Sequence, residues 1–365
     1  MARLGDYVRI RTGKLDANAS SENGQYPFFT CAVEPLKIDT YSYECECVLV
    51  AGNGDLNVKY YNGKFDAYQR TYIIESLDKT VLTVPYLYRF LDKYVETLRQ
   101  QAIGGVIKYI KLGNLTEAEI PIPSVAEQNE IVIKLNKANE LITLRKEQLA
   151  KLDQLVKSRF IELFGDPVIN SKGWPVCELS EYIQFLTSGS RGWAQYFTES
   201  GEYFITIKNV KNCRITLDDV QHVVPPDNAE AKRTRVHEGD LLISITADLG
   251  RTGVVTKEIA DYGGYINQHL TCIRLNKDAV RPLYVAYYME SEAGKSQFQA
   301  KNQSAVKAGL NFNSINSLKL MVPPIELQEA FITFVEQTDK SKLAIQQSLD
   351  KLELLKKSLM QEYFG

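Results

Sequence analysis

The sequence predicts an α+β protein in which two mixed α/β domains are separated by two long helices that form an antiparallel coiled coil. Three observations predict this class: a repeat at an offset of 200 residues, a seven-residue apolar rhythm in two segments, and short apolar runs broken by glycine and asparagine elsewhere. A chain of 365 residues is long for one domain and comfortable for two. The repeat implies pseudo-two-fold internal symmetry.

The repeat is clearest at the end of each half. KLDQLVKSRFIELFG at 151–165 and KLELLKKSLMQEYFG at 351–365 are identical at eight of fifteen positions. Both stretches are charged, helical in pattern and closed by Phe-Gly. Gly165 is followed by Asp-Pro, which is a strong signal for the end of a helix.

The same offset extends the repeat towards the N-terminus. IPIPSVAEQNEI precedes the first helical stretch and LMVPPIELQEAF precedes the second, so that Pro123 aligns with Pro323 and Gln128 with Gln328. Each proline comes just before a helical pattern, where its missing N–H does no harm. The repeated unit is therefore a short apolar strand, a proline turn and a long helix.

Each long helix has an apolar position every three or four residues, in a narrow stripe typical of a coiled coil. The stripe predicts helix-interface residues at Leu135, Ile142, Leu149, Leu152 and Val156 in the first helix and at Ile345, Leu349, Leu352 and Leu359 in the second. Charged residues interrupt it at Arg145, Arg159, Lys342 and Lys356. We expect the helices to pack on each other; packing of each on its neighbouring domain stays an alternative.

The other two segments are rich in Val, Ile, Tyr, Phe and Thr and resemble each other weakly. VLVAGNG at 48–54 is similar to LLISITADLG at 241–250, and both predict a buried strand followed by a turn. AYQRTYII at 67–74 is similar to YINQHLTCIRL at 265–275. YLYRFL and YVAYYM predict a helix in each segment. The pattern indicates one architecture with two divergent surfaces.

The composition, 44% hydrophobic and 24% charged, is typical of a soluble protein. No apolar run is long enough to span a membrane and no signal peptide is evident, so we expect a cytoplasmic protein. Six cysteines without a CxxC pair predict reduced thiols and no metal site. The net charge of −2 neither indicates nor excludes a nucleic-acid partner.

The sequence lacks the motifs of catalysis. No GxGxxG, no GxxxxGK[ST] and no adenine-methyltransferase signature is present. The nearest approach to a metal-dependent nuclease site is Asp227, Glu230 and Lys232, which lie within six residues and are too close for the usual placement on two strands. No catalytic residue is predicted.

Each of the two variable segments is followed by the same three features. These are a proline turn (PSVAEQ or PPIELQ), a long helix and a closing Phe-Gly. In this organisation the whole chain resembles the specificity subunits of type I restriction–modification systems. The resemblance implies target-recognition domains at 1–122 and 166–322, each for one half of a bipartite DNA site, and spacer helices at 123–165 and 323–365. A helix of about 38 residues spans roughly 57 Å, or roughly 17 base pairs of B-DNA.

The resemblance also implies the partners. They are double-stranded DNA, two methyltransferase subunits and, in the full complex, two ATP-driven restriction subunits. S-adenosylmethionine, ATP and magnesium are expected on those subunits, with no cofactor on this chain. The helices are expected to set the spacing and to dock the methyltransferase subunits.

DNA recognition requires cationic, amide and hydroxyl side chains on loops, for base edges and phosphates. The candidates in the first domain are Arg11, Lys14, Lys59, Tyr61, Arg70 and Lys108. Those in the second are Ser190, Arg191, Trp193, Arg233, Arg235, Lys301, Gln303 and Lys307. The polar loop TSGSRGWAQYF predicts that Arg191 and Trp193 are exposed.

Two other functions stay open at this point. The chain could be a DNA methyltransferase or nuclease that acts alone, although the motifs for both are missing. It could also be a coiled-coil adaptor whose variable domains bind ligands other than DNA. Binding that does not weaken with salt would favour the adaptor.

Overall fold

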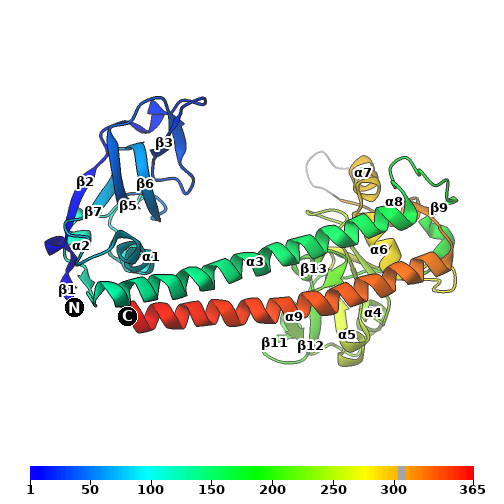
Figure 1. Cartoon of the computed structure of the whole chain (residues 1–365). Helices are drawn as coiled ribbons and strands as arrows, with labels where there is room; N and C mark the ends of the chain where they lie inside the picture. Colours follow the sequence, from blue (N-terminus) through cyan, green and yellow to red (C-terminus); the bar gives the residue numbers. More distant parts are fainter. Residues whose placement is uncertain (303–308) are drawn as a thin grey trace. The chain divides into compact units, whose positions relative to one another are not determined.

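The computed structural model describes residues 1–302 and 309–365, which form two compact units (Figure 1). Unit 1 comprises residues 1–148 and 345–365, and unit 2 comprises residues 149–344. Each of the two 40-residue helices, α3 (Val125–Phe164) and α9 (Ile325–Phe364), contributes to both units. The α+β class with two long helices is confirmed. The division into recognition domains and spacers at 122, 165 and 322 stays a proposal.

Unit 1 is built on one six-stranded sheet, in the order β2-β7-β5-β6-β3-β4. Neighbouring strands are antiparallel except β6 and β3, which are parallel. The bounds of these strands are β2 Val8–Thr12, β3 Tyr26–Phe29, β4 Leu36–Ile38, β5 Tyr43–Ala51, β6 Val58–Ala67 and β7 Thr71–Ser76. The remaining elements are β1 Ala2–Arg3, which pairs with β8 Glu119–Ile120, and the helices α1 Val84–Gln101 and α2 Leu112–Thr116.

Both faces of this sheet are covered, which explains the continuous apolar runs in its central strands. Val48 and Val50 of β5 point into a core shared with α1, whereas Cys47 and Leu49 point into a second core on the other face. This alternation follows from the two-residue period of a strand. The predicted strand VLVAGNG and the predicted helix YLYRFL are confirmed as β5 and α1.

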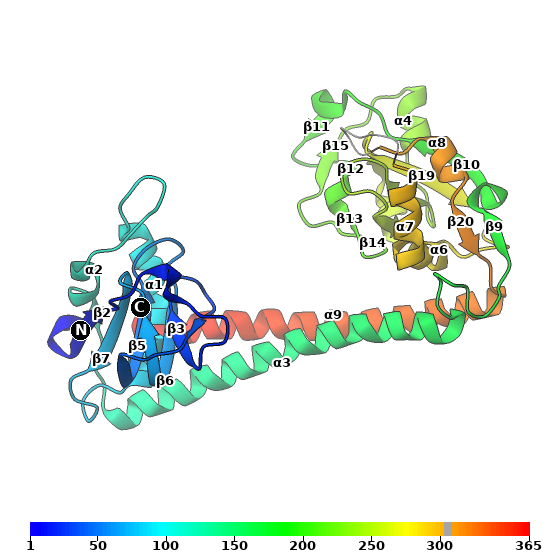
Figure 2. The same ribbon diagram turned by 90° about the horizontal axis from the view of Figure 1, so that it is seen from above.

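Unit 2 contains two four-stranded sheets (Figure 2). The first has the order β10-β19-β16-β17, from β10 Ile183–Ser188, β16 Leu241–Ser244, β17 Thr252–Val254 and β19 Leu270–Leu275. The second has the order β11-β15-β12-β18, from β11 Phe197–Thr198, β12 Glu202–Ile205, β15 Gln221–Val223 and β18 Gly264–Ile266. Two short pairs complete the strands: β13 Val210–Lys211 with β14 Arg214–Ile215, and β9 Val176–Glu178 with β20 Lys319–Met321.

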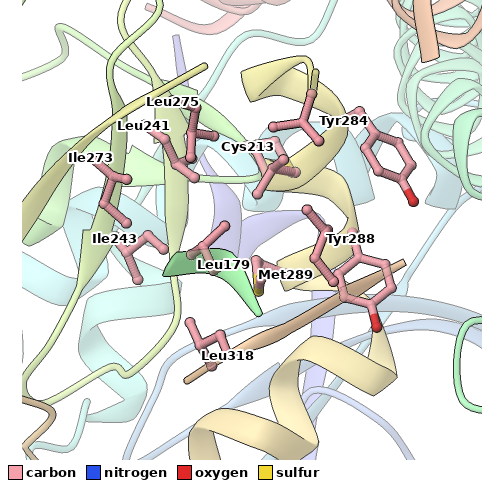
Figure 3. Packing of buried hydrophobic residues seen from close by; sticks show 14 of the residues in the cluster. Leu179, Cys213, Leu241, Ile243, Ile273, Leu275, Tyr284, Tyr288, Met289 and Leu318 are labelled. Atoms are coloured by element: carbon pink, nitrogen blue, oxygen red, sulfur yellow. The ribbon is translucent and has the colours of Figure 1, made fainter. Parts of the chain in front are cut away.

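The helices of unit 2 are α4 Ala229–Thr234, α5 Lys257–Tyr262, α6 Pro282–Glu290, α7 Glu292–Ala300 and α8 Phe312–Asn316. Figure 3 shows the main core, in which Tyr284 and Met289 of α6 pack with strand residues that include Leu241 and Ile273. The intervening Leu242 of β16 points into a separate core. The predicted strand LLISITADLG and helix YVAYYM are therefore also confirmed.

In unit 1, the first part of α3 lies against the last part of α9. Leu135 is fully buried in the same core as Met360 and Phe364. Further along, Lys146 Nζ lies 2.9 Å from Glu353 Oε1. As the residue numbers increase along α3, those of the contacting residues on α9 decrease, so the two segments are antiparallel.

In unit 2, the last part of α3 lies against the first part of α9. Phe160 and Phe164 pack edge-to-face with Phe331, with ring centroids 5.4 and 5.5 Å apart. Lys342 Nζ donates to Asp153 Oδ1 at 2.5 Å. The α3 helix ends at Phe164, and Gly165 follows with a φ of +79°, as the Gly-Asp-Pro stop predicts.

The predicted interface positions all lie on the covered side of the long helices. Leu135, Ile142, Val156 and Leu349 are buried, and Leu149, Leu152, Ile345, Leu352 and Leu359 are half-buried. The interrupting Arg145, Arg159, Lys342 and Lys356 are half-buried on the same stripe. Long cationic side chains suit such positions because their stems cover apolar surface while the charge stays near water.

Two buried glutamines, which the repeat aligned, join the start of each long helix to the neighbouring domain. Gln128 accepts from Thr83 N and Thr83 Oγ1 and donates to Val81 O and Pro123 O, at 2.7–3.2 Å. Thr83 is the residue before α1, so Gln128 binds one of the unpaired N–H groups at a helix start.

The second copy uses the same device with fewer bonds. Gln328 accepts from Arg281 N, just before α6, and donates to Pro323 O, both at 2.9 Å. A tyrosine of α1 or α6 binds the segment just before each proline turn: Tyr86 OH donates to Pro121 O and Tyr284 OH donates to Met321 O, at 2.9 and 3.0 Å. Burial raises the pKa of Tyr86 to about 12. The repeated Gln and Tyr thus hold the repeated proline turn.

Within residues 1–302 and 309–365, none of the helices has the length and apolarity needed to cross a bilayer. All six cysteines carry free thiols.

Candidate nucleic-acid interface

A tight turn in unit 1, Tyr68–Arg70, joins β6 to β7 and is held from several sides. Tyr68 N donates to Phe29 O, and Thr71 N closes the turn by donating to Tyr68 O, at 2.9 and 2.8 Å. Arg70 O accepts from Gly52 N at 2.8 Å, and Thr71 O accepts from Gly13 N at 3.1 Å. With its backbone bound in this way, the turn can present the side chains of Gln69 and Arg70 in a defined direction.

Unit 2 holds an equivalent turn, Asn267–His269, between β18 and β19. Asn267 N donates to Ile205 O at 3.2 Å, and Leu270 N donates to Asn267 O at 3.1 Å. His269 O accepts from Ile245 N at 3.0 Å, and Leu270 O accepts from Gly189 N at 3.2 Å. All four bonds match those of the first turn. The two units therefore share a backbone frame at this place, and Gln268 takes the position of Gln69.

Glycine is required on one side of each turn because the backbone of the preceding strand lies against it. A Cβ atom on Gly13 would lie 2.1 Å from Ala67 O, and one on Gly189 would lie 2.1 Å from Ile266 O. Neither contact is possible without movement of the backbone, since the colliding atoms belong to the strand that leads into the turn.

Replacing Gly13 with alanine should therefore displace the turn and destabilise unit 1 by about 1–3 kcal/mol. The matched control is Gly113→Ala, because the nearest atom to its added Cβ is a flexible Glu117 side chain 3.8 Å away. This control should be neutral or stabilising by up to about 1 kcal/mol. Urea unfolding of both variants measures the difference; equal free energies of unfolding would contradict the packing argument.

Polar, cationic and acidic side chains surround the turn of unit 1, where Gln69 Nε2 donates to Asp16 Oδ1 at 2.9 Å. Gln69 and Arg70 are exposed and, with Thr12, line a cavity of about 270 Å³. Lys14 is exposed next to the turn, since Lys14 N donates to Ala67 O at 3.2 Å. Lys108 is exposed on a loop tied to the same edge through its carbonyl, which accepts from Gly54 N at 2.9 Å. The structure thus brings together the predicted Lys14, Arg70 and Lys108.

The turn of unit 2 carries different chemistry on the same frame. His269 Nδ1 lies 2.7 Å from Thr246 Oγ1, and Gln268 Nε2 lies 3.1 Å from His269 Nε2. Ser190 pairs with Asn267 in an isolated bridge, and the exposed Arg191 follows it. Arg233 Nη1 donates to Ser188 O at 2.9 Å, at the end of β10. The predicted Ser190, Arg191 and Arg233 are therefore near this turn.

Three predicted residues of the first domain are engaged within the protein. Arg11 Nη2 lies 2.5 Å from Glu75 Oε1 on the neighbouring strand, and its guanidinium lies over the Tyr43 ring. Lys59 is half-buried, donates to Asn57 Oδ1, and has its pKa lowered by burial. Tyr61 packs its ring against Phe29 and Phe65 in the second core of unit 1. Glu75, Tyr43 and Phe29 belong to other strands of the sheet, so these partners are not visible in the local sequence.

The expectation that Trp193 is exposed is wrong. Its side chain is 4% exposed, its ring lies 5.3 and 5.1 Å from those of Phe204 and Tyr265, and its Nε1 donates to Ser190 Oγ at 3.1 Å. The loop is polar, but β12 and β18 offer an aromatic surface that the large indole covers. Trp193 therefore supports Ser190 from beneath and cannot itself contact DNA.

The other candidates of the second domain have internal partners or cannot be placed. Arg235 lies 3.3 Å from Glu202 and donates to Tyr265 OH, and Lys301 Nζ donates to Ser317 Oγ at 2.7 Å. Gln303 and Lys307 lie outside the described residues.

Two side chains at the turn of unit 2 were absent from the predicted DNA-binding residues: Gln268 and His269. A signal for them existed in the similarity of AYQRTYII to YINQHLTCIRL, because aligning the two glutamines places Arg70 on His269. The reason for this alignment is the set of backbone hydrogen bonds that the two turns share. Those bonds cannot be read from the local sequence.

The described parts of the chain, 1–302 and 309–365, contain no group of three His, Cys, Asp or Glu side chains placed to bind a metal ion. Asp227 and Lys232, the closest resemblance to a nuclease site in the sequence, form an exposed ion pair of 2.9 Å.

Comparison with known families decides the classification. The family model for the type I restriction modification DNA specificity domain matches residues 1–154 and again 172–355. The chain belongs to this family. The two matches correspond to the two halves of the repeat.

Individual members of the family are more distant. The specificity subunit of the type I restriction enzyme EcoDI from Escherichia coli is 38% identical over 154 residues, which are 42% of this chain and 34% of that subunit. The chain spans 34–64% of the lengths of this and three further curated relatives from Escherichia coli and Salmonella.

Solved structures agree with the fold. The crystal structure of a type I restriction-modification S subunit from M. genitalium matches with a TM-score of 0.63 at 16% identity, covering 100% of this chain and 95% of that one. A chain from a structural study of complex assembly and conformational transition of the type I R-M system matches with a TM-score of 0.60 at 17% identity, covering 100% and 96%.

Proposed function

We propose that this chain is the DNA-sequence-recognition subunit of a type I restriction–modification complex. The turn of each unit would contact the bases of one half of a bipartite DNA site. The observation that carries the proposal is the pair of turns with four matching backbone hydrogen bonds and different side chains: Gln69 and Arg70 in one unit, Gln268 and His269 in the other. A common frame with divergent polar side chains suits recognition of two different sequences by one mechanism.

The chemistry of the side chains supports a division of roles. Arginine binds guanine and glutamine binds adenine through paired hydrogen bonds to base edges in the major groove. We therefore assign base contacts to Gln69 and Arg70. Lys14, Lys108 and Arg191 would contact phosphates, which position the protein without carrying sequence information.

The long helices would set the distance between half-sites and dock the methyltransferase subunits. Apolar side chains on α3 and α9 remain exposed and are available to a partner: Ile133, Leu144, Leu155, Ile161, Leu343, Leu354 and Leu355. Leu155 and Leu355 are equivalent in the repeat, which supports two identical methyltransferase subunits rather than one. Two restriction subunits would complete the complex.

Within that assembly this chain would have no catalytic role. Methyl transfer and cleavage, with S-adenosylmethionine, ATP and magnesium, would belong to the partner subunits. The absence of methyltransferase and ATPase motifs from the sequence supports this assignment. A cytoplasmic location stays part of the proposal.

Modification-sensitive sequencing of the host genome, with the gene intact and deleted, tests the proposal. We expect a split motif with an unspecified gap to lose its methylation on deletion. Exchanging residues 166–319 for the corresponding segment of a relative should then change one half of the motif only. A change in both halves, or methylation that persists without the gene, would contradict the proposal.

A different result would favour a non-DNA adaptor. The complex with the methyltransferase subunit would then fail to bind DNA, or its affinity for DNA would not fall as the salt concentration rises. Either result would indicate that the turns bind another ligand.

A further inference from the structure

A loop of unit 1 displays apolar side chains where the surface is otherwise polar. It joins α1 to α2, and its large apolar residues are strongly exposed: Ile103 at the base is 44% exposed, and Val106 and Ile107 at the tip are 103% and 62% exposed. Isolated exposed apolar residues are common on protein surfaces. Two adjacent ones at one loop tip, with Val106 fully exposed and Ile103 exposed below them, form a local apolar surface that points to an interaction.

The base of this loop is firmly held. Ile103 N donates to Tyr109 O and Tyr109 N donates to Ile103 O, at 3.0 and 2.9 Å, which closes the loop like a small hairpin. Lys108 O accepts from Gly54 N and Ile110 N donates to Gly52 O, both at 2.9 Å. Gly52 also binds the carbonyl of Arg70. The tip is therefore attached to the same edge of the sheet as the Tyr68–Arg70 turn.

Within the stretch of sequence that contains the loop the charges are of one sign, and one of the cations, Arg99, pairs with Asp55 of a neighbouring segment at 3.6 Å. From residue 97 to residue 116 the sequence contains no acidic residue and three cations, Arg99, Lys108 and Lys111. Lys108 and Lys111 are exposed, and the exposed Arg70 lies beside the loop base. Double-stranded DNA has stacked, apolar bases between two anionic phosphate backbones. A loop with an apolar tip and a cationic base is complementary to that arrangement.

We propose that Val106 and Ile107 form a wedge that enters the DNA beside the half-site of unit 1 and contacts or separates a base step, while Lys108 holds the adjoining phosphate. Apolar side chains inserted between base steps unstack them partly and kink the duplex by about 20–90°. The wedge would supply shape-dependent selectivity at a step that no polar side chain contacts. This inference rests on the proposed function.

The test uses the full chain with its methyltransferase subunit and a duplex that carries the motif found by methylation mapping. 2-Aminopurine is placed at successive positions of the half-site of unit 1, and dyes at the duplex ends report bending by energy transfer. The variant is V106S/I107S, whose exposed positions should leave folding unchanged. The matched control is L77S: Leu77 is also 62% exposed and lies at the opposite end of β7 from the turn.

We expect the wild type and L77S to increase 2-aminopurine fluorescence at one step and to bend the duplex. V106S/I107S should lose both signals and bind the duplex about tenfold more weakly, a change of about 1.4 kcal/mol. Its salt dependence should be unchanged because no phosphate contact is removed.

Three outcomes would overturn the inference. Specific binding by the wild type without bending or increased fluorescence would show that no wedge forms. Equal behaviour of V106S/I107S and the wild type would show that the tip does not contact DNA, and loss of methyltransferase association by this variant would assign the tip to a protein partner. A wild-type complex with no sequence preference would instead contradict the proposed function itself.

Discussion

Replacing Arg70 with alanine is expected to weaken specific DNA binding about 5- to 150-fold and to relax the sequence preference in one half-site only. The expected loss corresponds to about 1–3 kcal/mol for one paired contact between an arginine and a guanine. Arg70 is suited to this contact because its side chain is exposed whereas its carbonyl accepts from Gly52 N, which fixes the backbone. Binding to a library of duplexes randomised in one half-site measures the effect.

Two further variants separate the possible roles of this charge. Lys79→Ala removes an exposed cation beyond the other end of β7, where Lys79 pairs with Glu46, and should leave the sequence preference unchanged. Arg70→Lys keeps the charge but loses the planar fork of the guanidinium, so it should recover the specificity only in part. Uniform weakening of binding by Arg70→Ala with the sequence preference unchanged, and recovery of affinity by Arg70→Lys, would assign this residue to a phosphate instead of a base.

Replacing Gln128 with leucine is expected to produce the largest loss of stability, about 3–5 kcal/mol in unit 1. Leucine has a similar volume but removes four hydrogen bonds of a fully buried side chain, so that Thr83 N, Val81 O and Pro123 O lose the partner that Gln128 supplies. Each such bond contributes about 0.5–1.5 kcal/mol. Gln328→Leu should cost less, about 2–3 kcal/mol, because Gln328 makes two of these bonds where Gln128 makes four.

Urea unfolding of the full chain, with hydrogen exchange of the α1 and α6 amides, measures these changes unit by unit. The control is Gln154→Leu, the same chemical change at an exposed position of α3, which should alter the free energy of unfolding by less than about 0.5 kcal/mol. Equal losses for Gln128→Leu and Gln328→Leu would contradict the argument from bond number.

The sequence by itself determined the repeat, the family and the regular elements with the strongest local patterns. The end of α3 at Phe164 follows from Gly165-Asp-Pro, and the strands β5 and β16 follow from short apolar runs before turn residues. These signals can be read from the sequence because each acts on a few neighbouring residues. Hydrophobic periodicity, a helix cap and the missing N–H of a proline all affect the backbone at their own position in the chain.

Only the tertiary structure decided which predicted site residues reach the surface. Arg11 has Glu75 as a partner because β2 lies beside β7, and Trp193 is buried because β12 and β18 place Phe204 and Tyr265 beneath it. Gln128 and Gln328 were visible as a repeated letter, yet their role depends on the start of another helix 45–47 residues away in sequence. These partners depend on which strands and helices lie next to each other in the folded chain. No local sequence pattern specifies that arrangement.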